Sequence, residues 1–220
     1  MLNNRRLILG AMAPQHEEGE DKSYYILTSN PTEKIYFDNT PIDNFCTEGD
    51  NTTSITIDGV SIVKNTIKEI HFGEKYFDVV TIPEYFMYHF IGLVSIDIPS
   101  FATTIGNNAF MNCSGLTSLT IPNSVISIGD NAFMNCNGLT TLTIGNSVDT
   151  IGNNAFSNCS DLDSVTIGTA DWSDVIVGIN VMSGVPNTGA ETIIAISQEQ
   201  GEAFKAKIGD SISNWQIIVS

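Results

Sequence analysis

IGNNAFMNCSGLTSLTIPNSV occupies Ile105–Val125, and it returns almost verbatim as IGDNAFMNCNGLTTLTIGNSV over Ile128–Val148. A third copy begins at Ile151, which sets the period at 23 residues. The same residue types recur in register through these copies at alanine, phenylalanine, cysteine, leucine and isoleucine positions. A fixed period in the twenties is typical of a solenoid, in which each copy forms one turn of a stacked coil.

The repeat extends to both sides of the clear copies. The preceding copy is Ile82–Thr104, and the following copy, Val177–Val185, comes after an insertion at Thr169–Ile176. The segment Ile67–Phe72 has the pattern of one further strand. We therefore expect about five turns.

Each copy divides into three pieces by its local pattern. Leu116–Ile121 alternates apolar and polar residues, which predicts a strand with Leu119 and Ile121 facing inward. The Asn or Asp that follows each glycine favours the start of a short helix, because its side chain can accept hydrogen bonds from free amides. The PNSV and GNSV segments predict the bend that leaves the strand.

One copy is too small to fold alone, because burying a few apolar side chains does not offset the entropy of ordering 23 residues. Stacked copies share a core, and the two ends of the stack need caps. The SYYILTSNPTEKIYF segment predicts a hairpin turning at Ser29–Thr32, and the last residues predict a strand, a short helix and a strand that bring Trp215 over the open end. The expected organisation is a flexible or attachment tail at 1–22, an N-terminal β cap at 23–66, repeats at 67–196 (clearest at 82–169) and a C-terminal cap at 197–220.

The pattern L-x-x-L-x-I-P-x-S-V-x-x-I-G-x-x-A-F-x-x-C resembles the BspA-like leucine-rich repeat family, most closely over Ile82–Thr169. The resemblance implies an α/β solenoid with a parallel β-sheet on its concave face and short helical turns opposite, capped at both ends. Family members are known chiefly as cell-surface proteins of host-associated bacteria and some parasitic protists. The resemblance therefore implies binding or adhesion without catalysis, at an extracellular or cell-surface location.

Composition excludes several classes of function. The chain has 25 acidic and 9 basic residues in 220, a formal charge of −16, so nucleic acid and anionic lipid are repelled. No stretch approaches the length of apolar sequence that spans a bilayer. Near the N-terminus, Arg5 and Arg6 precede only Leu7–Leu9 before small residues, which is shorter than a secretory signal requires.

The cysteines at 113, 136 and 159 recur at the repeat interval, which raises the question of a metal site or a disulfide. Equivalent side chains of a stack run parallel, and Phe90 and Val185 take the same place in the flanking copies. We interpret the three thiols as a buried packing ladder. None of the histidines lies in a metal or nucleophile motif, and the sequence predicts no catalytic residue, no metal and no cofactor.

The outward positions of the strands predict the binding surface. They form a run of small hydroxyls with charged residues at one end, although threonine also suits an exposed strand for structural reasons alone. Aromatic and arginine anchors are missing from it, so weak contact per site is expected, or contact elsewhere, for example around Asp171 and Trp172 or around Tyr85, Tyr88 and His89. The candidate ligand-binding residues are Glu69, His71, Ser95, Asp97, Ser118, Thr120, Thr141, Thr143, Ser164 and Thr166.

Three functions compete at this stage. The first is a non-enzymatic module that presents the repeat surface to a host protein, a glycan or another cell. The second is a virion-attached fibre or decoration protein that docks through its N-terminal segment, which could also mediate oligomerisation. The third, an enzyme with its site in Leu2–Asn65, is disfavoured because that region lacks paired acid and base residues.

Overall fold

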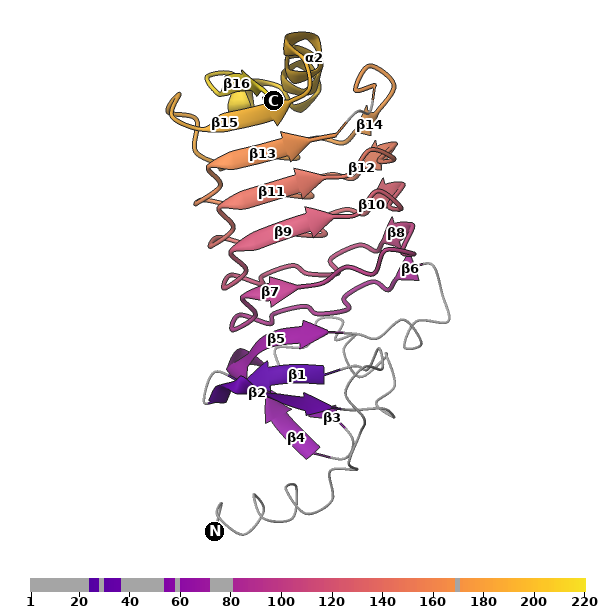
Figure 1. The fold of residues 1–220 in the computed structure, drawn as a ribbon, viewed down its shortest axis with the longest axis vertical. Coiled ribbons are helices and arrows are strands. Elements are labelled where there is room, and N and C mark those ends of the chain that lie inside the picture. Colours follow the sequence, from indigo (N-terminus) through magenta and orange to yellow (C-terminus); the bar gives the residue numbers. More distant parts are fainter. Residues whose placement is uncertain (1–23, 28–29, 37–53, 58–59, 72–80, 169–170) are drawn as a thin grey trace.

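The computed structural model describes residues 24–27, 30–36, 54–57, 60–71, 81–168 and 171–220. They form a tall stack of strands, with the first described strands at one end and the last at the other (Figure 1). The elements are β1 (Tyr24–Leu27), β2 (Asn30–Tyr36), β3 (Ser54–Ile57), β4 (Val60–Val63), η2 (Lys64–Thr66), β5 (Ile67–His71), β6 (Thr81–Ile82), β7 (Ser95–Ile96), β8 (Thr104–Ile105), β9 (Ser118–Ile121), β10 (Ser127–Ile128), β11 (Thr141–Ile144), β12 (Thr150–Ile151), β13 (Ser164–Ile167), β14 (Ile176–Val177), β15 (Thr192–Ala195), α2 (Gln198–Ile208), η4 (Asp210–Ile212) and β16 (Gln216–Val219).

The chain is a parallel solenoid of about six turns, one more than the sequence predicts. From β9 to β14, each coil contributes a four-residue strand to one sheet and a two-residue strand to a second sheet, as in β9 and β10. The long strands pair in the order β16-β15-β13-β11-β9, and the short strands in the order β14-β12-β10-β8-β6. Pairing of Leu119 with Leu142, and of Leu142 with Val165, keeps the 23-residue period in exact register.

The first described strands are antiparallel. The predicted hairpin is present as β1 and β2, but the pairing of Leu27 with Asn30 places its turn earlier than the predicted Ser29–Thr32. β1 also pairs antiparallel with β5, and β5 pairs parallel with β7. The hairpin thereby joins the side of β5 that faces away from the repeats.

In the described coils, hydrogen-bonded turns take the place of the short helix expected after each glycine, so this prediction was wrong. Residues 107–112 form hydrogen-bonded turns, and their alternate N–H groups donate to the next coil, for example from Asn108 to the Asp130 carbonyl at 2.9 Å and from Phe110 to Ala132 at 2.8 Å. The side chain of Asn107 likewise accepts from the Asp130 N–H of the next coil, at 2.8 Å, and not from a helix of its own. We call this segment of each coil the arc.

Two positions in each arc lie in the left-handed region of backbone conformation, which asparagine tolerates better than most residues. The first holds Tyr85 (φ 57°), Asn108 (58°), Asn131 (55°), Asn154 (54°) and Asn180 (56°). The second holds His89 (66°), Asn112 (65°), Asn135 (61°), Asn158 (60°) and Gly184 (77°). This backbone requirement explains why asparagine recurs four residues apart in the clear copies.

The asparagine side chains form two amide ladders along the stack. In each ladder the Nδ2 of one coil donates to the Oδ1 of the preceding coil. The four bonds are Asn131 to Asn108 (3.2 Å), Asn154 to Asn131 (3.3 Å), Asn135 to Asn112 (2.7 Å) and Asn158 to Asn135 (2.9 Å).

The core is continuous along the stack. The Phe133 ring stacks on Phe110 at a centroid distance of 5.1 Å and on Phe156 at 5.4 Å, and all three side chains are fully buried. Leu119 and Ile121 face inward, as predicted. Successive coils therefore share one interior and do not form separate cores.

The repeat cysteines are fully buried packing residues, as the repeat pattern indicated. Each thiol donates to a carbonyl of the preceding coil, from Cys113 to Met87 at 3.1 Å and from Cys136 to Phe110 at 3.4 Å. Cys113, Cys136 and Cys159 are free thiols. Burial raises the pKa of Cys113 to about 12 and that of Cys159 to about 12, and it raises the pKa of Cys136 well above its usual range.

We expect these thiols to be inert in the folded protein, because the thiolate is the reactive form and burial suppresses it. A Cys46→Ser variant, which removes the cysteine that lies outside the described residues, reports on the repeat thiols alone. At about pH 8 a thiol reagent should leave them unmodified in buffer and modify all of them in guanidinium chloride. Rapid modification before denaturation would contradict a shared interior.

The C-terminal elements continue the long sheet beyond the clear repeats. β15 pairs with β13 and β16 pairs with β15, while α2 lies beside these strands at the end of the stack (Figure 1). Trp215 is 2% exposed, and its Nε1 donates to the Pro186 carbonyl at 2.7 Å. The strand, helix and strand thus occur as predicted, and the capping role of residues 197–220 stays a prediction.

The insertion before β14 packs against α2. The register shift from Ile151 to Val177 is 26 residues instead of 23, so this coil is longer than its neighbours. Trp172 is buried, and its ring packs edge to face with that of Phe204 of α2, with the ring centroids 4.7 Å apart. Lys207 of the same helix donates to the Val175 carbonyl at 3.0 Å. The insertion is therefore held against the helix by a ring contact and a hydrogen bond.

A buried carboxylate stabilises the loop before β15. Burial alone would raise the pKa of Glu191, but hydrogen bonds from the Thr188 hydroxyl and from the N–H groups of Thr188 and Gly189 outweigh burial and hold the pKa below its usual range. The hydrogen bonds of the folded loop therefore favour the ionised form of Glu191.

Candidate ligand-binding face

The outward side chains of the long strands form the predicted face, which we call the β-face. Strand register places them in two straight rows, because equivalent residues of β9, β11 and β13 pair directly. The first row is Ser118, Thr141 and Ser164, and the second row is Thr120, Thr143 and Thr166. Between the rows, the inward leucines and valine of the same strands are buried.

The hydroxyls of these six residues make no hydrogen bond to any described part of the protein. Thr117 and Thr140, which precede the strands, behave differently, since their hydroxyls donate to the Val94 carbonyl at 3.4 Å and to the Thr117 carbonyl at 3.0 Å. The hydroxyls of the threonines just outside the face thus form hydrogen bonds within the protein. The six hydroxyls of the rows remain available to solvent or to a ligand.

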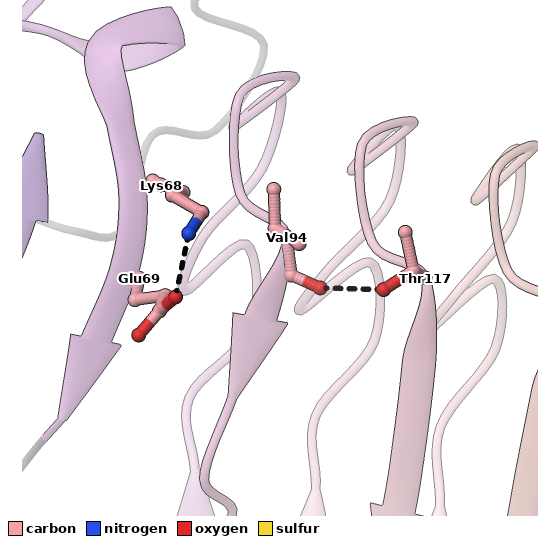
Figure 2. A network of polar contacts seen from close by, with 4 residues as sticks. All are labelled: Lys68, Glu69, Val94 and Thr117. Carbon is pink, nitrogen blue, oxygen red and sulfur yellow. Dashed lines mark hydrogen bonds and ion pairs between the residues drawn. The ribbon is translucent and has the colours of Figure 1, made fainter. Parts of the chain in front are cut away.

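The N-terminal part of the face carries charge. Glu69 pairs with Ser95 across β5 and β7, and its carboxylate lies 3.1 Å from the ammonium group of Lys68, with about a third of each side chain exposed (Figure 2). The same view shows the Thr117 hydroxyl directed at the Val94 carbonyl of the adjacent coil. The Glu69 carboxylate thus has a cationic partner within its own strand.

The remaining predicted residues differ in how far the structure places them. Asp97 follows β7 and is exposed. His71 ends β5, and its side chain lies outside the described part of the structure. Glu69 and Ser95 belong to the sheet β2-β1-β5-β7, whereas the hydroxyl rows belong to the sheet from β9 to β16, so the predicted residues divide into two groups.

Sequence reasoning missed the extension of both rows at the C-terminal end. Thr192 and Gln216 continue the first row, and Ile194 and Ile218 continue the second. The alternating pattern of Thr192–Ala195 was visible in the sequence, but the longer preceding coil hid its register. The second row therefore ends in apolar side chains, of which Ile218 is 48% exposed.

The charged side chains of the repeat array are nearly all acidic. The sequence contains no Lys or Arg between Lys75 and Lys205, while Asp and Glu recur through this stretch. Several of these acids are exposed, including Asp161 and Asp163 beside β13. The face is thus a neutral hydroxyl surface within an acidic array.

The described residues offer no site for metal chemistry, since they hold no group of His, Cys, Asp or Glu side chains arranged to bind an ion. None of their helices reaches the length and apolar character that crossing a bilayer requires. The attachment and oligomerisation roles predicted for residues 1–22 fall outside the described residues, as does Cys46.

The comparisons with solved structures return bacterial leucine-rich repeat proteins. A leucine-rich repeat protein from Bacteroides ovatus is 22% identical over 69% of this chain and 30% of its own, with a TM-score of 0.45. The leucine-rich repeat protein of T. pallidum is 22% identical over 58% of this chain and 64% of its own, with a TM-score of 0.47. The pneumococcal vaccine antigen PcpA is 17% identical over 77% of this chain and 48% of its own, with a TM-score of 0.46.

This chain thus matches less than two thirds of the length of each of these proteins. No curated protein matches it in sequence.

The family model described as a BspA-type leucine-rich repeat region matches residues 80–173 in six copies. These residues include the strands β6 to β13 and the arcs between them. Residues 80–173 therefore match the BspA-type leucine-rich repeat family that the sequence pattern resembles.

Proposed function

We propose that this chain is a non-enzymatic binding module that presents its β-face to a protein or glycan on another surface. The observation that carries the proposal is the pair of straight hydroxyl rows, whose six hydroxyls have no partner among the described residues. Surface hydroxyls without internal partners lose little when they exchange water for a ligand. The match of residues 80–173 to the BspA-type repeat family supports a binding or adhesion role.

The β-face suits broad and weak contact. Its side chains are short, so a flat partner can approach the sheet closely, and few rotamers are lost on binding. Large aromatic anchors are absent from the described part of the rows, so each contact contributes little and affinity depends on contact along several coils. The repeat family also supports a location at the cell surface or outside the cell.

The test changes the second row by a Thr120→Lys, Thr143→Lys and Thr166→Lys triple variant. We expect binding to immobilised host proteins or glycans to fall at least about tenfold, because long charged side chains separate the sheet from a flat partner. Binding is measured on protein and glycan arrays and then by surface plasmon resonance with the strongest partner found.

The matched control adds the same charge outside the rows, at the exposed positions Ser100, Asn137 and Ser147. If binding falls equally in both triple variants, net charge and not the β-face is responsible. If the β-face variant binds as strongly as the wild type, this face is not the contact surface.

A further inference from the structure

The first arc of the array carries aromatic residues where later arcs carry asparagine. Its backbone is the same, since the N–H groups of Tyr85, Met87 and His89 donate to the next coil at 3.0, 2.6 and 2.9 Å. Its side chains differ, because EYFMYHF over 84–90 replaces the NNAFMNC of 107–113. Tyr85 and His89 therefore occupy the two ladder positions of this coil.

These two residues sit in an unfavourable backbone conformation. Tyr85 has φ 57°, in a region that bulky side chains rarely adopt, and His89 has φ 66°, which histidine tolerates better than tyrosine. Burial in the core does not fully explain why tyrosine and histidine occupy these positions, because both side chains are only half-buried. The neighbouring Phe86 and Phe90 are fully buried. Strained residues held at a surface are characteristic of ligand contacts.

Together with Tyr88, they form a small aromatic cluster on the arc. The rings of Tyr85 and Tyr88 lie 5.8 Å apart and those of Tyr88 and His89 lie 4.6 Å apart, both edge to face. All three are half-buried, so ring surface is presented to solvent. Among the described arcs, the others hold asparagine, methionine, serine or glycine at these positions.

The amide ladders end beside this cluster. In the next two coils Nδ2 donates to the preceding asparagine at both positions, but the residues that precede Asn108 and Asn112 in the stack are Tyr85 and His89. Within the described structure, the Nδ2 groups of Asn108 and Asn112 have no acceptor. Two amide donors therefore lie next to the exposed rings.

The exposed rings and the amide donors together indicate the chemical class of the ligand. Aromatic rings bind the C–H face of a pyranose, and amide donors bind its ring and hydroxyl oxygens. An anion is disfavoured by the formal charge of −16. The same net charge attracts a cationic side chain, but at the cluster itself the positive charge of Lys64, which acts on His89, opposes it. Burial first and Lys64 second lower the pKa of His89, so its ring is neutral near neutral pH.

We propose that Tyr85, Tyr88 and His89, with the amides of Asn108 and Asn112, form a binding site for a neutral carbohydrate at the N-terminal end of the arcs. The site rests on the proposed function of the chain as a binding module, but it lies on the arc and not on the β-face. It supplies the aromatic contacts that the β-face lacks.

The experiment replaces the cluster by the residues of the next coil, in a Tyr85→Asn, Tyr88→Met and His89→Asn variant. Because asparagine suits both left-handed positions and the three new residues occupy the equivalent places of the adjacent arc, the variant should melt at or above the wild-type temperature. The full-length wild type and variant are applied to immobilised neutral oligosaccharides with hexose or N-acetylhexosamine ends, with sialylated oligosaccharides and an oligoarginine peptide as charged comparators. We expect the wild type to bind neutral sugars and the variant to bind them at least about tenfold more weakly.

Two results would overturn the site: no binding of any neutral oligosaccharide by the wild type, or equal binding by wild type and variant. Oligoarginine binding that the variant alone loses would also overturn it, in favour of a basic protein partner. The Thr120, Thr143 and Thr166 lysine variant separates the two proposals. If that variant loses sugar binding and the arc variant retains it, the β-face is the binding surface and the arc site is wrong.

Discussion

Replacing Phe133 by alanine should destabilise the protein by about 3–5 kcal/mol, which is the usual cost of removing a buried phenylalanine side chain. The ring is fully buried and stacks on Phe110 and Phe156 at 5.1 and 5.4 Å. Its loss leaves a cavity in the middle of the array and removes both stacking contacts. The free energy of unfolding, measured by urea denaturation with circular dichroism, tests this expectation.

A Phe133→Met variant is the matched control, because methionine naturally occupies this place in two other coils, as Met87 and Met182, both fully buried. It should cost less than about 1.5 kcal/mol, since a similar volume is retained. Equal losses in the two variants would show that ring stacking, and not filled volume, holds neighbouring coils together. A loss below about 1 kcal/mol for alanine would contradict a continuous core at this position.

Sequence periodicity predicted the long strands and the burial of the thiols because both depend on the identity of inward side chains. The Cys113 position is cysteine in all three clear copies and the Leu119 position is leucine or valine, because a position that always faces the core tolerates few residue types. The same logic predicted the rows of Thr120 and Thr143, since strand alternation fixes the outward positions. The candidate face was therefore predictable from one clear copy.

The arcs were mispredicted because their structure depends on neighbours. An asparagine after glycine is a good helix start in isolation, but the Asn107 oxygen accepts from the next coil, and Asn108 adopts a left-handed conformation. Hydrogen bonds across 23 residues leave no signature in local propensity. The sequence indicated Tyr85, Tyr88 and His89 as one alternative contact region, but their place at the end of the amide ladders depends on the same cross-coil bonds and was not predicted.

Replacing Asn135 by alanine should cost about 2–5 kcal/mol, the second large effect that the structure predicts. Its amide donates to Asn112 at 2.7 Å and accepts from Asn158 at 2.9 Å, so two bonds are lost. Each contributes about 0.5–1.5 kcal/mol, and alanine at φ 61° adds about 1–2 kcal/mol of backbone strain. Urea denaturation again provides the measurement.

Glycine at the same position separates the two causes, because glycine adopts the left-handed conformation without strain but forms no side-chain ladder. Asn135→Gly should therefore lose only the hydrogen-bond part, about 1–3 kcal/mol, and remain more stable than Asn135→Ala. Gly184 occupies the equivalent place at the end of the ladder, which shows that the backbone accepts glycine there. If the glycine variant were as stable as the wild type, the amide ladder would contribute nothing, and asparagine would recur in the arcs for its backbone conformation alone. If the alanine variant were the more stable of the two, the left-handed arc itself would be wrong.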